Sequence, residues 1–385
     1  MPPISPPLRA TASPPIPAAR QWADRYDGRA GPLIDLTQAV PGYPPHPELL
    51  VRLAEAAGRA DHAGYGPIDG DPALRHALAQ DIAETYGGEV GAADIAITAG
   101  CNLAFAMVAT AIAAPGDAVM LPAPWYFNHQ MALQMHGIAA LPLPCAAADG
   151  FLPDPARAAA LLHDRVRAIV LITPNNPTGA IYPPGLIAAF AELCRQRNIW
   201  LILDETYRNF LQGPPHGLFA DPAWRDVLLH IYSFSKGYCI PGHRLGAVAT
   251  GGEFRENLLK VLDTLQICPQ RPAQSAIAWA IPNLKSWREA NRHVMAARAD
   301  AFRRAIREAP DWHLDSLGGY FAYLRVRPGL PALETAASLA ENHGLATLPG
   351  PFFGPDQEAY LRLAFANVDL PAIAEIPGRL ALMPG

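Results

Sequence analysis

The sequence predicts an α/β protein that consists of a large domain, with a mainly parallel sheet flanked by helices, and a smaller α+β domain. Short apolar segments alternate with helical segments between about residues 46 and 280. Such alternation is typical of a mainly parallel sheet that is covered on both faces. After residue 281 the pattern changes to one long arginine-rich helix followed by hairpin-like strands. The chain of 385 residues also exceeds the usual size of a single domain.

The expected elements of the large domain follow one another in a regular order. Short apolar runs predict strands at 95–98, 118–121, 168–173, 200–204, 228–233 and 246–250. Longer segments with a helical pattern lie at 101–113, 126–136, 185–197 and 253–266. The strands of the small domain are expected at 320–326 and 360–366. Ligands of such parallel sheets gather at the carboxyl ends of the strands, so that edge is where we expect the site.

The domain boundaries follow from these changes of pattern. We expect the large domain to span residues 46–280, and the small domain to combine residues 21–45 with residues 281–385. Residues 1–20 are rich in proline and contain no acidic residue. Prolines interrupt both a helix and the apolar core of a signal peptide, so this stretch is expected to form an extended or mobile arm.

Composition excludes several classes of protein. The longest apolar runs are shorter than eighteen residues, which argues against a membrane span. The formal net charge is -5, and the lack of a basic block argues against nucleic-acid binding. The five cysteines are scattered and form no CxxC pair, which favours a reduced cytoplasmic protein without a metal site.

Lysine is rare in this chain, and one lysine has a distinctive setting. The three lysines are Lys236, Lys260 and Lys285. Lys236 follows an expected strand within Ser233-Phe234-Ser235-Lys236, and Arg244 comes eight residues later. A primary amine beside hydroxyls and a guanidinium suits an imine next to a phosphate. The structural alternative is a solvated loop lysine.

Three further turns follow expected strands. Asp204, at the end of 200–204, and Tyr207 suit a pyridine nitrogen and a ring hydroxylate, although such a carboxylate also commonly caps a helix. Asn176 lies in an Asn-Pro-Thr-Gly turn that needs no function to explain it. Gly100, Cys101 and Asn102 open a helix, where backbone N–H groups bind phosphate, although this signal by itself is weak.

Together these motifs resemble the class I/II aminotransferases of fold type I, the aspartate aminotransferase superfamily. The resemblance runs from about residue 32 to the end of the chain. It rests on the order and spacing of several motifs: Tyr65, Gly70 and Leu74-Arg75, then Gly100, Pro124-Trp125-Tyr126, Asn176-Pro177-Thr178-Gly179, Asp204 with Tyr207, Ser233 to Arg244, and Leu361-Arg362-Leu363-Ala364-Phe365-Ala366. Any one motif has alternatives, whereas the ordered set specifies the family.

The resemblance implies pyridoxal 5'-phosphate (PLP) as the cofactor and a role for each matching residue. Lys236 would form a Schiff base with PLP and move the proton between the substrate Cα and the cofactor C4'. Asp204 would bind the pyridine nitrogen, and Asn176 and Tyr207 the ring oxygen. The phosphate would be held by Gly100, Cys101, Asn102, Ser233, Ser235 and Arg244. Either Trp125 or Tyr126 would stack on the ring, and the spacing favours Tyr126.

The family also implies contacts with the substrate and with a second subunit. Arg362 would bind the substrate α-carboxylate, with Asn176 nearby. A strand at 360–366 would leave Arg362 among small neighbours, and the alternative is an arginine in a structural ion pair. Ala39 stands where family members commonly have glycine in the segment that covers the substrate, which leaves substrate size and reaction type open. Tyr65 would reach the cofactor phosphate of the partner in a homodimer with shared active sites.

The function implied is therefore transfer of an amino group between an amino acid and a 2-oxo acid. The alternative is another PLP reaction on an amino acid, such as that of a β-lyase, cyclase or decarboxylase, because the cofactor supports them all. Residues 31–50 contain no Lys or Arg, which favours a neutral or aromatic substrate. Arg271 would either supply a cation to the partner's site or lie in the interface. The irregular N-terminus disfavours a DNA-binding regulator, and the missing GxGxxG disfavours a dehydrogenase.

Overall fold

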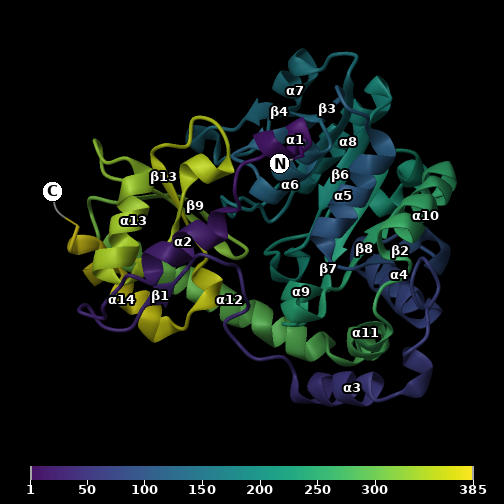
Figure 1. The fold of residues 1–385 in the computed structure, drawn as a ribbon, viewed down its shortest axis with the longest axis horizontal. Coiled ribbons are helices and arrows are strands. Elements are labelled where there is room, and N and C mark those ends of the chain that lie inside the picture. Colours follow the sequence, from purple (N-terminus) through teal and green to yellow (C-terminus); the bar gives the residue numbers. More distant parts are fainter. Residues whose placement is uncertain (1, 384–385) are drawn as a thin grey trace.

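The computed structural model describes residues 2–383, and its elements form two groups along the longest axis of the molecule (Figure 1). The larger group surrounds a seven-stranded sheet, and the smaller group contains a four-stranded antiparallel sheet. A third sheet pairs the short strands β1 (Ile34–Asp35) and β11 (Leu345–Ala346). The predicted fold class, a large α/β part with a smaller α+β part, is confirmed.

The seven-stranded sheet has the strand order β2-β8-β7-β6-β5-β3-β4. All neighbours are parallel except at β8, which runs antiparallel to both β2 and β7. The strands span Ile95–Thr98 (β2), Ala118–Ala123 (β3), Ala139–Pro144 (β4), Val166–Ile172 (β5), Trp200–Asp204 (β6), Leu228–Ser233 (β7) and Gly246–Ala249 (β8). The strands β2, β3, β7 and β8 are buried at every position, which explains why their sequences are apolar without alternation.

Helices cover both faces of this sheet. They span Pro47–Ala57 (α3), Pro72–Tyr86 (α4), Cys101–Ile112 (α5), Phe127–Met135 (α6), Pro155–Leu161 (α7), Pro184–Arg197 (α8), Phe234–Gly237 (α9), Gly252–Gln266 (α10) and Arg271–Asn283 (α11). Along β5, Ile169 and Leu171 pack into a core with α4, α8 and α11. Ala168 and Val170 face the opposite core with α5, α6 and α10. Successive side chains of β5 therefore point to opposite faces of the sheet and pack into two separate cores.

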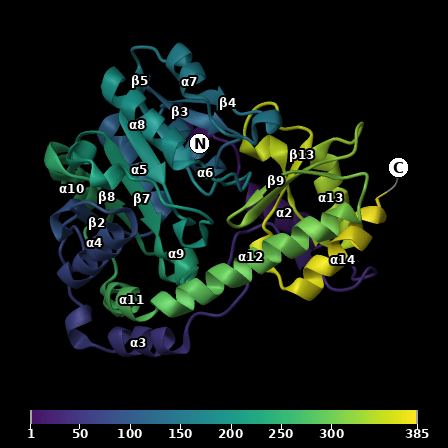
Figure 2. The same ribbon diagram turned by 180° about the vertical axis from the view of Figure 1, so that it is seen from behind.

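The smaller group has its own core around the order β12-β13-β10-β9. Its strands are His313–Gly318 (β9), Phe321–Arg325 (β10), Leu348–Pro349 (β12) and Tyr360–Leu363 (β13), and its helices are Ala332–His343 (α13) and Leu370–Ala381 (α14). The 23-residue helix α12 (Lys285–Arg307) extends from α11 beside the large group to the small group (Figure 2).

Several sequence expectations need correction. The last strand ends at Leu363 and not at residue 366, because Phe365–Asn367 forms a 3₁₀ turn. The edge strands β4 and β9 were missed. β4 is apolar but contains Pro142 and Pro144, which disfavour a strand, and β9 is only partly buried and lacks a continuous apolar run. The N-terminal arm is not extended: it forms the helices α1 (Pro6–Ala10) and α2 (Pro15–Ala23). Both helices have proline in their first turn, where the missing N–H costs no hydrogen bond.

Candidate active site

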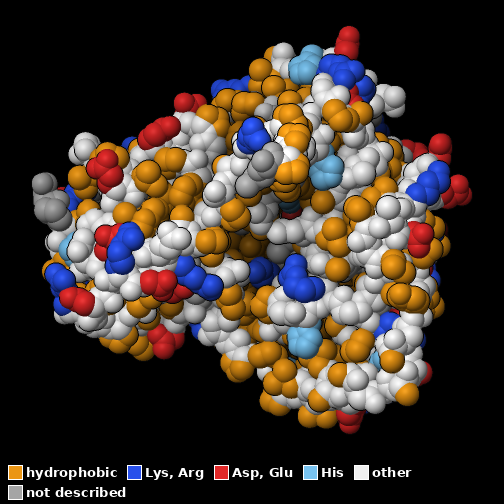
Figure 3. All heavy atoms as spheres, viewed as in Figure 1, with side chains coloured by type: hydrophobic (Ala, Val, Ile, Leu, Met, Phe, Trp, Pro, Cys, Tyr) orange, Lys and Arg blue, Asp and Glu red, His pale blue; other side chains and the backbone are white. Residues whose placement is uncertain are grey.

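A cavity of about 660 Å³ lies where the two groups of elements meet, and Figure 3 shows the hollow between them. Its walls include Asp204 at the end of β6 and Arg362 in β13, so both groups contribute. The sequence-predicted residues that line it are Ala39, Cys101, Asn102, Tyr126, Asn176, Asp204, Tyr207, Ser233, Ser235, Lys236, Arg244 and Arg362.

The sheet topology explains why these residues meet. Strands β2, β5, β6 and β7 all point the same way, so the turns that follow them lie at one edge of the sheet. Asn176 follows β5, Asp204 ends β6, Ser233 ends β7, and Cys101 follows β2. This is the edge at which ligands of open parallel sheets bind.

Lys236 lies in the short helix α9, and its partly buried side chain forms part of the cavity wall. The amine donates a hydrogen bond to the carbonyl oxygen of Ala39. Burial, together with the positive charges of Arg362 and Arg244, lowers the pKa of Lys236 to about 8. More of the amine is therefore neutral near pH 7 than in an exposed lysine, and the neutral amine is the form that attacks an aldehyde.

Asp204 is buried and held by several donors. The Thr206 N–H donates to its Oδ1 at 2.9 Å, and His129 Nε2 lies 3.3 Å from its Oδ2. Burial opposes ionisation, but His129 and the Thr206 hydrogen bonds bring the pKa of Asp204 below its usual value. The carboxyl is therefore ionised at neutral pH, as a partner for a protonated ring nitrogen must be.

His129 was missed by the sequence reasoning. Its ring stacks on Phe105 at 3.8 Å between centroids, and its Nδ1 is buried without a hydrogen-bond partner. The only signal in the sequence was its spacing of three residues from Tyr126, which puts both near one side of α6. That spacing does not reveal that the His129 ring lies next to the Asp204 carboxylate.

Tyr126, and not Trp125, lines the cavity. The Asn128 side-chain amide donates to the Tyr126 hydroxyl at 2.8 Å, and that hydroxyl lies 3.3 Å from Asn102 Oδ1. The Trp125 ring instead lies against Gly354, beside a second cavity. This geometry supports Tyr126 as the residue that stacks on a bound ring.

One end of the cavity is suited to a phosphate. Gly100 caps the start of α5 with φ of 95°, and a Cβ there would overlap the Arg244 guanidinium, so glycine is required. Gly100 itself does not line the cavity. The two residues after it, Cys101 and Asn102, do line it, together with Arg244. Ser233 Oγ accepts a hydrogen bond from the Ser235 N–H at 3.3 Å. Backbone and hydroxyl donors therefore meet a guanidinium at a helix N-terminus.

Arg362 is 2% exposed and lies between the rings of Phe321 and Phe353. Its Nη1 donates to Asn176 Oδ1 at 3.3 Å, whereas Nε and Nη2 are buried without partners. No carboxylate within residues 2–383 forms an ion pair with it, which contradicts the structural ion-pair alternative. Burial lowers the pKa of Arg362 to about 10. Each buried unpaired donor costs about 1–3 kcal/mol, which a bound carboxylate would recover.

Tyr65 and Arg271 lie outside this cavity. The side chain of Tyr65 is 82% exposed. Arg271 lies 3.4 Å from the Asp71 carboxylate and donates to the carbonyl of Asp61, so partners within its own chain hold its guanidinium. The N-terminal segment, which the sequence reasoning left outside the site, contributes Ile16 to the cavity wall.

The residues present fit PLP. Three cationic side chains line the cavity, and Asp204 is the one lining carboxylate among the residues that the structure describes. None of Lys236, Arg244 and Arg362 is ion-paired with a carboxylate in the described part of the chain. A ligand that combines a phosphate, an aldehyde and a basic ring nitrogen would match these groups, with a substrate carboxylate on Arg362.

Comparison with known proteins agrees with this geometry. The family model of aminotransferase class I and II matches residues 32–380. The chain is 30% identical to an arginine–pyruvate transaminase of Pseudomonas aeruginosa, over 82% of this chain and 81% of that protein. It is 26% identical to an aromatic aminotransferase of Arabidopsis thaliana, over 87% and 85%. An Escherichia coli structure with a reported methionine aminotransferase function, YbdL, covers 100% of both chains with a TM-score of 0.89 at 26% identity.

The fold is also that of an aspartate aminotransferase from Thermus thermophilus, with a TM-score of 0.90 over 99% of both chains at 24% identity. The predicted family and the predicted enzyme class are thus confirmed. The chain belongs to the class I and II aminotransferases and is an enzyme of the transferase class.

Proposed function

We propose that this aminotransferase binds PLP through Lys236 and moves an amino group between a neutral or aromatic amino acid and a 2-oxo acid. One observation carries the proposal: the amine of Lys236 shares a cavity with Asp204 and with two arginines that have no carboxylate partner among residues 2–383. The relatives described above are transaminases, and nothing favours the alternative of a β-lyase, cyclase or decarboxylase.

Each residue then has a physical task. Bound PLP supplies an aldehyde that joins a primary amine, and a ring that accepts electrons from the substrate Cα. Asp204, held ionised by His129 and Thr206, would keep the ring nitrogen protonated. Lys236, once its amine is free, would take the proton from Cα and return it on the cofactor side. Arg362 would orient the substrate through its carboxylate.

The ring and phosphate would be held by the remaining residues. Tyr126 would stack on the ring, and Asn176 and Tyr207 would contact its oxygen. Arg244 would bind the phosphate with its fork of donors. The other phosphate contacts would come from Gly100, Cys101, Asn102, Ser233 and Ser235.

The preference for a neutral or aromatic side chain follows from the rest of the wall. Ala39, Val40, Ile16 and Phe127 are apolar, and Gln38 is uncharged. The cationic residues of the wall already have tasks with the cofactor or the α-carboxylate. Within residues 2–383 the cavity wall therefore offers no further lysine or arginine for a second carboxylate, and burial of that carboxylate without a partner would be costly.

This function predicts a specific outcome for a panel of amino donors. Each amino acid is added to the PLP form, and loss of the visible cofactor band and release of the 2-oxo acid are measured. Neutral and aromatic donors should convert the cofactor at least about tenfold faster than aspartate or glutamate. A tenfold ratio corresponds to about 1.4 kcal/mol, which does not exceed the free-energy cost of burying one unpaired charge. A 2-oxo acid should then restore the band. Release of ammonia, or of CO₂, without formation of the amino form of the cofactor would contradict transamination.

We also propose a homodimer in the cytoplasm. Tyr65 is exposed outside its own cavity, and Leu265 and Ile267 are exposed at the end of α10. Leu265 lies in the last turn of α10 and Ile267 directly after it, and such exposed apolar side chains suit an interface with a second copy of the chain. All five cysteines are free, which agrees with a reducing compartment. Within residues 2–383 no helix is long and apolar enough to cross a membrane.

The proposed domain division remains 46–280 for the large domain and 21–45 with 281–385 for the small domain, with residues 1–20 as an N-terminal arm. The separate cores of the two sheets support it. The helix α2 packs mainly against α13, and α1 against α6, so the arm contacts both groups of elements.

If Tyr65 acts across the interface, two inactive proteins should restore activity together. Tyr65→Glu would repel the phosphate, and Lys236→Ala cannot bind the aldehyde. After subunit exchange, a mixed dimer has one site with both defects and one with neither. Random pairing should therefore restore roughly a quarter of all sites. Failure to recover activity, with exchange demonstrated by mass spectrometry, would contradict a role of Tyr65 across the interface.

A further inference from the structure

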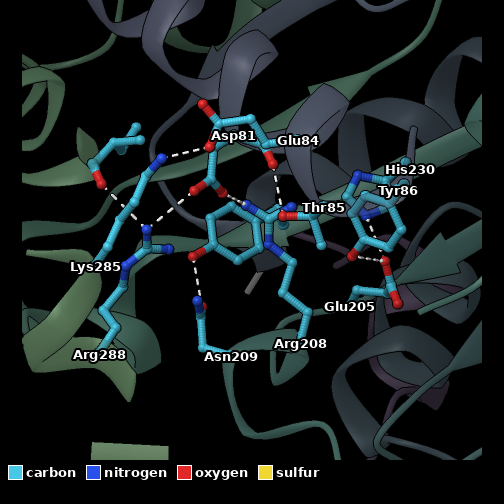
Figure 4. A network of polar contacts seen from close by, with 12 residues as sticks. Asp81, Glu84, Thr85, Tyr86, Glu205, Arg208, Asn209, His230, Lys285 and Arg288 are labelled. Carbon is cyan, nitrogen blue, oxygen red and sulfur yellow. Dashed lines mark hydrogen bonds and ion pairs between the residues drawn. The ribbon is translucent and has the colours of Figure 1, made fainter. Parts of the chain in front are cut away.

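Residues 204–208 place their side chains on two sides of the chain. Asp204, Thr206 and Tyr207 line the cavity. Glu205 and Arg208 point away from it into a buried network of polar side chains, which Figure 4 shows. The residues that line the cavity and those that belong to the network alternate along one short segment of chain. The position of Glu205 and Arg208 in the network therefore constrains the orientation of the cavity-lining side chains.

Glu205 is 2% exposed and anchors the start of this segment. Its Oε2 accepts a hydrogen bond from His230 at 2.9 Å and another from Tyr86. His216 Nε2 lies 3.2 Å from the same oxygen, and its Nδ1 accepts the Leu218 N–H, which leaves Nε2 protonated to donate. Three donors from separate parts of the chain thus hold one carboxylate.

Arg208 anchors the end of the segment. Its guanidinium forms a buried ion pair with Asp81 of α4 and lies 4.0 Å from the centroid of the Tyr232 ring. The other oxygen of Asp81 accepts a hydrogen bond from Arg288 of α12 at 3.0 Å. The Arg208 N–H also donates to the Glu205 carbonyl at 3.0 Å, which closes a turn around Tyr207.

This network is not a second binding site. Its two carboxylates, Asp81 and Glu205, are balanced by Arg208 and Arg288, so it leaves no net charge for a ligand. Among residues 2–383 no group of three or more acidic, histidine or cysteine side chains is arranged to hold a metal ion. The network lies directly behind the turn that carries Tyr207, and this position indicates a role in holding the turn in place.

We propose that Arg208, clamped by Asp81, is a positioning residue that holds the Tyr207 hydroxyl in the cavity. The inference rests on the proposed function, in which Tyr207 donates a hydrogen bond to the ring oxygen of PLP. Arg208 does not line the cavity, so it would act through the turn that carries Tyr207. A lysine at this position keeps the charge but loses the planar fork and the stacking on Tyr232.

The test is a double-mutant cycle with Tyr207→Phe and Arg208→Lys. Two properties are measured: the pH midpoint of the visible band of the PLP-loaded protein, and the affinity of the unloaded protein for PLP. A hydrogen bond from Tyr207 to the negatively charged ring oxygen would stabilise the deprotonated form of the bound cofactor. Tyr207→Phe removes this hydrogen bond, so it should raise the pH midpoint by about one pH unit and weaken PLP binding about tenfold. Arg208→Lys should shift both properties in the same direction.

The decisive comparison is the double variant. If Arg208 acts through Tyr207, Arg208→Lys should cause no further shift in the Tyr207→Phe protein. Arg225→Lys is the matched control, because Arg225 also forms an ion pair with a carboxylate, that of Asp94, but belongs to the turn Pro222–Asp226 and not to the turn that carries Tyr207. It should shift neither property. If Arg208→Lys fails to fold, Asp81→Asn, which keeps the size of the partner, replaces it in the same cycle.

The two levels of the argument fail differently. Additive shifts in the double variant, or an unshifted Arg208→Lys protein, would overturn the role of Arg208 while leaving that of Tyr207 intact. A Tyr207→Phe protein with the midpoint and affinity of the parent would overturn the contact assigned to Tyr207 in the proposed function, and the inference with it.

Discussion

Replacement of Lys236 by alanine should abolish both the yellow colour of the purified protein and its turnover. Among residues 2–383 no other lysine lines the cavity, so the aldehyde of PLP would have no lysine partner within this site. The proton at the substrate Cα would also lose its acceptor. Because both tasks fall on one group, we expect kcat to drop by about four powers of ten or more.

The chain offers two matched controls for this prediction. Lys260 donates to Asn257, and Lys285 pairs with Glu84, so both amines have partners far from any phosphate-binding turn. Lys260→Ala and Lys285→Ala should keep colour and turnover. Reduction of the parent protein with borohydride, followed by peptide mapping, should label Lys236. Label on either of the other lysines would show that the assignment is wrong.

Asp204→Ala should retain the fold and lose at least about three powers of ten in kcat. Without the carboxylate the ring nitrogen would lose its proton at neutral pH, and the ring would accept electrons poorly. The variant also leaves His129 without its partner, since His129 Nε2 lies 3.3 Å from Asp204. Steady-state kinetics with the best donor of the panel, at saturating PLP, provides the measurement.

Asp117→Ala is the matched control for Asp204→Ala. Asp117 is also a buried carboxylate next to a strand of the same sheet, but it precedes β3 at the opposite edge and pairs with Arg165 and Arg167. Its loss should lower stability without changing kcat. Near-normal turnover of Asp204→Ala with PLP bound would mean that Asp204 is only a helix-capping residue.

Much of the large sheet was predictable from sequence, for a physical reason. A strand buried on both faces must be apolar at successive positions, so β5, β6 and β7 appear as continuous apolar runs. The edge strand β4 escaped prediction because Pro142 and Pro144 disfavour a strand in this otherwise apolar segment. The N-terminal helices escaped because proline count alone does not separate a helix start from a helix interior.

Local pattern was sufficient to predict which side chains end the parallel strands, and hence that Asp204, Ser233 and Lys236 lie at one end of the sheet. It also placed Arg362 on a strand, which the structure confirms. The contact of His129 with Asp204, the position of Tyr126 rather than Trp125 in the cavity wall, and the ion pair of Arg208 with Asp81 depend on the three-dimensional packing. Periodicity specifies the face on which a side chain lies, but the partner on that face depends on strand order and helix packing between segments distant in the chain.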